Sequence, residues 1–101
     1  MVTDVRPDRL RSRLAAGENL VILDVREADE VAGQPFPGAV HIPIGQLADR
    51  VGEIPHTRPI VVVCHSGVRS AAAADALDRA GWPAENLAGG IVAWMATEPG
   101  A

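Results

Sequence analysis

Two short apolar runs constrain the fold of this chain more than any other feature of its sequence. Residues 20–23 and 60–63 contain no polar side chain, and the second run consists of isoleucine and valine alone. Such runs are typical of strands that are buried on both faces of a parallel sheet. Helix signals follow them, most clearly in the alanine-rich residues 70–80. Because strand and helix signals alternate, the sequence predicts an α/β fold with a mainly parallel sheet.

Shorter elements are expected between and beyond these segments. A first helix begins at Pro7 and ends at Gly17, since proline suits the first helical turn and glycine suits the left-handed position after the last turn. We also expect helices over residues 27–32, 44–51 and 91–96 and strands over residues 39–42 and 85–88. In the alanine-rich helix, small side chains form a stripe that can pack closely on the sheet: Ala73, Ala76, Leu77 and Ala80.

Length and charge exclude several classes of protein. A chain of 101 residues is expected to form one domain over residues 1–101. Its net charge of −4 argues against nucleic acid or an anionic membrane as partner. All 9 basic residues are arginine, so neither Schiff-base lysine chemistry nor a lysine-dependent phosphate loop is available.

The cysteine, the histidines and the apolar segments limit which metal sites, disulfides and membrane segments the protein can have. Cys64 is the one cysteine, which rules out an internal disulfide, a CxxC redox pair and a cysteine-based zinc site. The 3 histidines are scattered, with no cysteine beside them to complete a structural metal site. No segment approaches the ~20 apolar residues of a membrane helix, and no signal-like apolar region follows the first residues. We therefore expect a soluble cytoplasmic protein with no metal, no cofactor and no membrane partner.

The segment after the second apolar run carries the strongest indication of chemistry. Its sequence is Cys64-His65-Ser66-Gly67-Val68-Arg69-Ser70, a short loop that leads from a strand into a helix. In open α/β sheets, ligands bind at the edge formed by the carboxyl ends of the strands, where this loop begins. The N–H groups of such a loop, the positive end of the helix and the arginine all favour a thiolate over a thiol. Cys64 is therefore the candidate nucleophile.

Residues of this segment also have structural interpretations. A lone cysteine at the end of a valine-rich strand is often a small buried hydrophobe, although an arginine at a crowded helix start favours a function. His65 can be a surface residue or a neighbour that lowers the pKa of Cys64. Ser66 and Ser70 can be helix caps or ligands. Gly67 supplies a backbone angle that other residues resist.

Four motifs in the same order resemble those of the single-domain rhodaneses. They are Leu23-Asp24-Val25-Arg26-Glu27 with Glu30, Pro37-Gly38-Ala39-Val40-His41-Ile42-Pro43, the segment from Cys64 to Ser70, and Leu87-Ala88-Gly89-Gly90-Ile91 with Trp94. The resemblance spans residues 21–94 and implies a sheet of about five mainly parallel strands with helices on both faces. One departure is Gly33-Gln34-Pro35-Phe36-Pro37-Gly38-Ala39, where the family commonly has Gly-His-Ile-Pro-Gly-Ala. It affects the loop near the site and not the fold.

The resemblance implies that the protein is a sulfurtransferase. Cys64 would attack the outer sulfur of a small anionic donor such as thiosulfate and expel sulfite. The resulting persulfide would pass its sulfur to a thiophilic acceptor, which is cyanide in the usual assay and a thiol or a protein in a cell. This is covalent catalysis in which Cys64 is both nucleophile and carrier.

The resemblance also implies roles for the neighbours of Cys64. The loop amides would hold the anionic group, and Arg69 would bind donor oxygens or polarise the pocket. The substrate-binding residues are His65, Ser66, Gly67, Val68, Arg69 and Ser70. Asp24 is expected to anchor the loop or an arginine. Arg26 is either a salt-bridge partner or a donor-binding group.

Three other functions fit parts of the pattern. Phosphatases and arsenate reductases of related fold place five residues between cysteine and arginine, whereas four separate Cys64 from Arg69, and a second cysteine is lacking. The shorter loop favours a sulfur atom over a phosphate group. A non-catalytic interaction module is disfavoured by the presence of Cys64, Gly67 and Arg69. A carrier in a sulfur relay, with a partner protein as acceptor, is compatible with the same residues.

Overall fold

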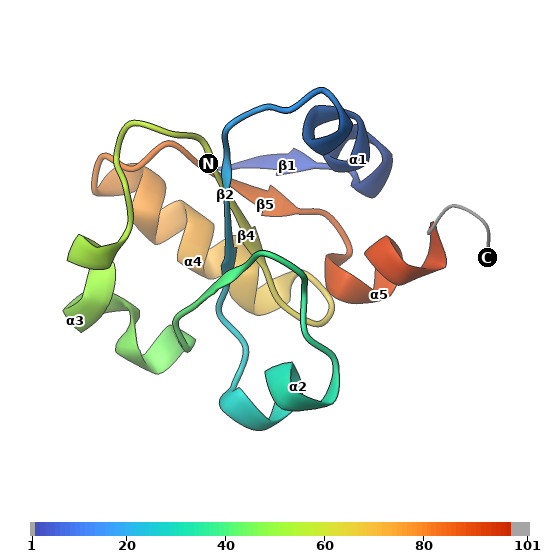
Figure 1. The fold of residues 1–101 in the computed structure, drawn as a ribbon. Helices are drawn as coiled ribbons and strands as arrows, with labels where there is room; N and C mark the ends of the chain where they lie inside the picture. The colour runs from blue at the N-terminus through green and yellow to red at the C-terminus, as the bar shows by residue number, and fades with distance from the viewer. Residues whose placement is uncertain (1, 98–101) are drawn as a thin grey trace.

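Five parallel strands form one sheet in the computed structural model, which describes residues 2–97 (Figure 1). The strands are β1 (Thr3–Val5), β2 (Val21–Asp24), β3 (Val40–His41), β4 (Ile60–Val63) and β5 (Ala84–Leu87). They lie in the order β1-β5-β4-β2-β3, and each neighbouring pair is parallel. β4 is therefore central, and its carboxyl end lies between those of β5 and β2.

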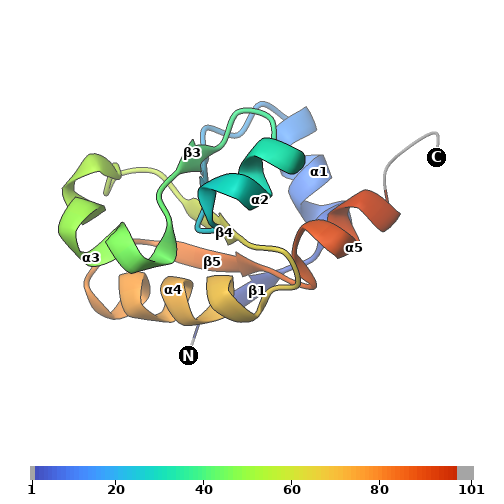
Figure 2. The same ribbon diagram turned by 90° about the horizontal axis from the view of Figure 1, so that it is seen from below.

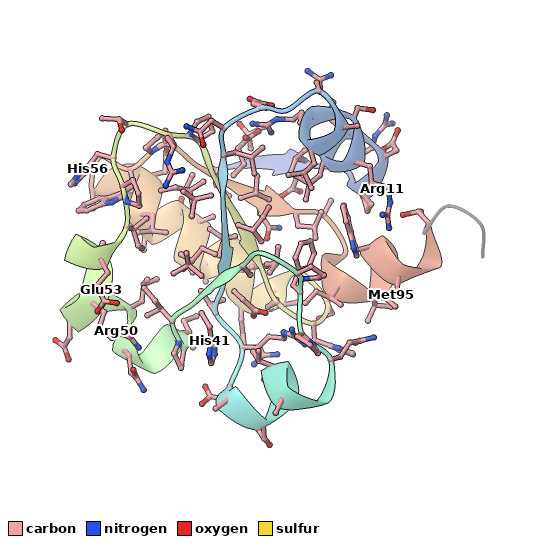
Figure 3. The ribbon with its side chains drawn as sticks, viewed as in Figure 1. Arg11, His41, Arg50, Glu53, His56 and Met95 are labelled. Atoms are coloured by element: carbon pink, nitrogen blue, oxygen red, sulfur yellow. The ribbon has the colours of Figure 1, made fainter. Side chains whose placement is uncertain are left out.

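Helices cover both faces of this sheet, as Figure 2 shows. On one face lie α3 (Leu47–Arg50) and α4 (Val68–Arg79), and on the other α1 (Pro7–Ala15) and α5 (Gly90–Ala96), while α2 (Ala28–Gly33) follows the carboxyl end of β2. Arg11 of α1, labelled in Figure 3, lies 3.7 Å from the centre of the Trp94 ring of α5 and so joins these two helices. Within residues 2–97, no helix has the length and apolar character needed to cross a bilayer.

The side chains of the central strands alternate between two hydrophobic clusters. Val21, Ile60 and Val62 belong to the cluster beneath α3 and α4. Ile22 and Val61 belong to the cluster beneath α1 and α5. Because both faces of β2 and β4 are covered, successive positions have to be apolar, which explains the two uninterrupted runs in the sequence.

The α/β class, the parallel sheet and the strand at residues 60–63 are confirmed. The strand signals in the sequence do not include β1. This edge strand has three residues, of which Thr3 and Asp4 are exposed and only Val5 is buried. A strand with a single buried side chain has no apolar run by which it could be recognised.

One predicted helix is only partly α-helical. Instead of a helix over residues 44–51, the chain forms a 3₁₀ turn at Ile44–Gln46, the single turn of α3, and a second 3₁₀ turn at Val51–Glu53. Gly45 and Gly52 lie within the two 3₁₀ turns, and glycine disfavours a continuous α-helix. The strand expected over residues 39–42 is also shorter, since only Val40–His41 pairs with β2.

The predicted stripe on the alanine-rich helix is partly correct. Ala73 and Leu77 are buried against the sheet, together with Ala74. Ala76 and Ala80 are instead exposed, and they lie beside Ala73 and Leu77 along an apolar groove of about 410 Å³ between α4 and α3. The buried face therefore follows the i, i+3, i+4, i+7 spacing from Ser70, whereas the expected stripe has the same spacing from Ala73, three residues later.

Candidate active site

Cys64 lies at the centre of the carboxyl edge of the sheet. It directly follows β4, and residues 65–67 connect it to α4. Its side chain is 1% exposed and adjoins the hydrophobic cluster beneath α3 and α4. Burial alone would make this thiol an inert small hydrophobe. The polar groups around its sulfur therefore decide what chemistry it can do.

Three hydrogen-bonding groups surround that sulfur. The N–H groups of Gly67 and Ser70 donate to Cys64 Sγ at 3.1 and 3.3 Å, and the Ser70 hydroxyl lies 3.2 Å away. Gly67 has a φ of +95°, which favours glycine and turns the chain back over the sulfur. Both amides lie at the start of α4, where helix N–H groups lack intrahelical partners and the helix dipole is positive. The arrangement is a cradle for negative charge on Sγ.

The pKa of the Cys64 thiol lies below its ordinary value. Burial, the largest single effect, raises this pKa because it disfavours the charged thiolate. The Ser70 hydroxyl and the N–H groups of Ser70, Gly67 and Ser66 together lower the pKa by more. The net direction makes Cys64 a better nucleophile near neutral pH than a cysteine buried among aliphatic groups.

The first residues of α5 form hydrogen bonds to the backbone of the cysteine loop. The Ile91 N–H donates to the Cys64 carbonyl at 2.9 Å, and the Val92 N–H donates to the His65 carbonyl at 3.0 Å. This approach is possible because Gly90 has no side chain, since a Cβ there would lie 2.5 Å from the His65 carbonyl oxygen. The glycine pair in the last motif therefore serves to position the loop.

Arg69, which was expected to bind donor oxygens, is held by Glu30 of α2. Its two terminal nitrogens donate to the two carboxylate oxygens at 2.6 and 2.8 Å. Glu30 also accepts the N–H of Glu27 at 3.0 Å, in the capping box that begins α2. The Arg69 guanidinium lowers the pKa of Glu30 to about 2, and Glu30 in turn raises the pKa of Arg69. A donor anion has to compete with Glu30 for these N–H groups.

Asp24 and Arg26 form a buried ion pair at the carboxyl end of β2. Their closest nitrogen and oxygen are 2.8 Å apart, and neither side chain is more than 2% exposed. Arg26 also donates to the Gln34 carbonyl at 2.7 Å. Phe36 is buried two residues further on, with its ring centre 5.0 Å from that of Trp94. Residues 34–36, where the chain departs from the common family pattern, are thus held in place by the Asp24–Arg26 pair and by the contact between Phe36 and Trp94.

The remaining predicted residues do not direct their side chains at the sulfur. His65, Ser66 and Val68 have exposed side chains, and Val68 is 74% exposed. The Ser66 N–H is the weakest of the three amides that lower the pKa of Cys64. In the described part of the chain, no three histidine, cysteine or acidic side chains lie close enough together to hold a metal ion.

Asn86 of β5 belongs to the site, although sequence reasoning gave it no role. It is 4% exposed, its Oδ1 accepts the Ser70 hydroxyl at 2.6 Å, and its Nδ2 donates to the Gly67 carbonyl at 3.3 Å. The available signal was a polar residue inside a strand near the carboxyl edge, where buried polar groups need partners. Glu30 lay within a recognised motif, but nothing in the sequence indicated that it would pair with Arg69.

The sequence and the fold match known proteins over nearly the whole chain. The family model for the Rhodanese-like domain matches residues 6–97. A sulfurtransferase of Allochromatium vinosum is 37% identical over 95 residues, which cover 93% of this chain and 89% of that protein. The thiosulfate sulfurtransferase GlpE of Pseudomonas savastanoi is 32% identical over 83 residues, which cover 81% of this chain and 78% of that protein. A crystal structure of a rhodanese-like domain protein from Staphylococcus aureus has a TM-score of 0.88 at 30% identity, and the match covers 98% of this chain and 95% of that one. The chain therefore belongs to the rhodanese-like sulfurtransferase family.

Proposed function

We propose that this protein moves sulfane sulfur from thiosulfate, or a similar small anionic donor, to a thiophilic acceptor through a persulfide on Cys64. The observation that carries the proposal is the cradle of Gly67 and Ser70 N–H groups around Sγ. A thiolate and an anionic persulfide both require such donors in a site shielded from water. Membership of a sulfurtransferase family, with GlpE among the relatives, supports the same chemistry.

Each of the two half-reactions transfers one sulfur atom, and atoms and electrons balance in both. The Cys64 thiolate attacks the outer sulfur of thiosulfate, so a bond forms between Sγ and that sulfur. The S–S bond of thiosulfate breaks, and its electron pair leaves with sulfite. Cyanide or a thiol then attacks the outer sulfur of the persulfide, and the electron pair of the broken bond returns to Sγ. The cycle consumes no metal, cofactor or external oxidant.

The neighbouring residues would control access and charge. Cys64 is buried at rest, whereas Arg69 and Glu30 are each about one-third exposed. We therefore assign these two side chains to the entrance, where they move when a donor approaches. Asp24 and Arg26 would keep the adjoining loop in place. A reducing compartment such as the cytoplasm would preserve the lone thiol.

Thiocyanate formation from thiosulfate and cyanide tests the proposal. We expect activity in the wild type and none in Cys64→Ser, which keeps the size of the side chain but lacks a thiolate. A wild type no more active than Cys64→Ser would contradict the proposal. Hydrolysis of aryl phosphates would favour the phosphatase alternative, and partner binding without turnover would favour an interaction module. Faster transfer to a protein thiol than to cyanide would identify a sulfur relay.

A further inference from the structure

The Ser70 hydroxyl has one proton and two possible acceptors. Its Oγ lies 2.6 Å from Asn86 Oδ1 and 3.2 Å from Cys64 Sγ. Ser70 is 0% exposed and Asn86 is 4% exposed, so these bonds lie inside the protein. A serine hydroxyl can donate only once, although it can accept twice. Which of the two acceptors receives this proton therefore depends on whether Cys64 is a thiol, a thiolate or a persulfide.

Asn86 can present only its oxygen to Ser70. Its Nδ2 donates to a carboxylate oxygen of Asp4 at 3.1 Å and to the Gly67 carbonyl at 3.3 Å. Neither a carboxylate nor a carbonyl oxygen can donate in return. Turning the amide over would place Oδ1 against both oxygens and lose both bonds. β1 and the cysteine loop thus fix an acceptor opposite the Ser70 hydroxyl.

We propose that Asn86 is a positioning residue that competes with the Cys64 thiolate for the proton of the Ser70 hydroxyl. When Cys64 is a thiol, its S–H donates to Ser70 Oγ and the hydroxyl donates to Asn86, so every group has a partner. When Cys64 is a thiolate, the hydroxyl either turns to Sγ and leaves Oδ1 unpaired, or stays with Asn86 and directs a lone pair at the charged sulfur. Both arrangements cost free energy that the thiol state does not.

This competition has a consequence for sulfur transfer, which rests on the proposed function. In a persulfide the negative charge resides on the outer sulfur, so Sγ no longer needs the Ser70 proton. The hydroxyl can then stay with Asn86, and every buried group is again satisfied. Asn86 therefore opposes the free thiolate relative to both the thiol and the persulfide, which favours loading of Cys64 with sulfur.

Other charged groups face the cluster from the neighbouring elements. Arg69 of α4 favours a thiolate by its charge, and Glu30 of α2 partly offsets that charge. Asp4 of β1 contacts Asn86 but not the sulfur. Asp24 and Arg26, at the end of β2, form an ion pair with each other. None of these groups supplies or accepts the Ser70 proton, so Asn86 is the competitor that the geometry identifies.

Alkylation of Cys64 by iodoacetamide, followed across neutral pH without any sulfur donor, tests this inference. Asn86→Leu removes the acceptor and keeps a side chain of similar volume. At pH values below the midpoint of the curve of alkylation rate against pH, we expect this rate to rise by roughly threefold to tenfold, which is the effect of one hydrogen bond. Asn86→Asp keeps the acceptor and adds charge, so the rate should fall. Both variants lose the N–H that binds Gly67. A role limited to tethering the loop would therefore change both rates in the same direction.

Two controls isolate the path through Ser70. In a Ser70→Ala background, Asn86→Leu should no longer raise the rate, because the contested proton is gone. Asn19→Leu makes the same chemical change at an exposed position before β2, and we expect no effect from it. Should Asn86→Leu fail to fold, as judged by circular dichroism, Asn86→Ala with and without Ser70→Ala gives the same comparison without adding a charge.

Two results would overturn the inference: changes of the same sign in Asn86→Leu and Asn86→Asp, or an equal effect of the uncharged Asn86 substitution with and without Ser70→Ala. The assay uses no sulfur donor and so does not depend on the proposed reaction. A protein that shows the expected alkylation pattern but forms no thiocyanate would contradict the proposed function and leave the role of Asn86 standing.

Discussion

Arg69 reaches from the first turn of α4 to Glu30 of α2 and donates two hydrogen bonds to its carboxylate, at 2.6 and 2.8 Å. The pair connects the helix that begins behind the cysteine loop to the segment that follows β2. Its side chains are 36% and 31% exposed, so water and small anions can reach both. The guanidinium that the family resemblance assigns to donor oxygens is thus occupied by an internal anion.

Glu30→Gln should raise the rate of the sulfur transfer from thiosulfate that we propose for this protein. The substitution removes a negative charge and a competitor for the Arg69 N–H groups, so a dianionic donor meets a more positive entrance. We expect kcat/KM for thiosulfate to rise by roughly threefold to tenfold, in line with about 1 kcal/mol for a partly exposed pair. Glu53→Gln, which breaks the exposed pair with Arg50, is the matched control. A fall in kcat/KM would show instead that Glu30 holds Arg69 in its productive position.

The same pair should make stability depend on pH in the acid range. In the folded protein the pKa of Glu30 is lowered from 4.5 to about 2. A carboxyl with a depressed folded pKa contributes its stability above the unfolded pKa and loses it as the pH falls through the folded one. Between these values the wild type should lose more stability than Glu30→Gln, by about 1 kcal/mol or less. Thermal unfolding at a series of pH values measures this difference, and parallel curves for the two proteins would contradict it.

Gly90→Ala should damage both the fold and the cysteine loop. A Cβ at this position would lie 2.5 Å from the His65 carbonyl oxygen, and the φ of +65° adds backbone strain. We expect the free energy of unfolding to fall by about 2–4 kcal/mol, measured by denaturant unfolding. Gly17→Ala is the control, because Gly17 has a φ of +77° but open space around it, and it should cost only about 1 kcal/mol. Equal losses would mean that the close contact with His65 contributes nothing.

Asp24→Asn should be among the most destabilising single substitutions in this protein. It leaves the Arg26 guanidinium, which is 2% exposed, without a compensating charge. Breaking a buried pair from one side costs about 3–5 kcal/mol. Asp8→Asn breaks the exposed pair with Arg6 and should change the free energy of unfolding by less than about 0.5 kcal/mol. If both variants unfold at the wild-type denaturant concentration, the ion pair does not anchor the loop.

The sequence predicted the interior of the sheet better than its edges. β2 and β4 are covered on both faces, and this burial demands the continuous apolar runs that reveal them. β1 has one buried side chain, and its parallel pairing with β5 joins residues far apart in the chain. The position of such an edge strand depends on tertiary packing, which no local pattern records.

The site residues also differ in how well the sequence could predict them. Cys64, Gly67 and Ser70 lie within one short segment, so their loop and helix could be inferred from local chemistry. Asn86 comes close to Ser70 only because β5 lies beside β4, with Asn86 in register with Val62. This pairing brings together residues from distant parts of the chain. Predicting such contacts requires the strand order as well as the motifs.

The central claim is that Cys64 accepts a sulfur atom, and the intact mass of the protein after treatment with thiosulfate tests it most directly. The account predicts a gain of one sulfur atom on the wild type, its loss on addition of cyanide, and no gain on Cys64→Ser. An unchanged wild-type mass, or the same gain on Cys64→Ser, would contradict the account.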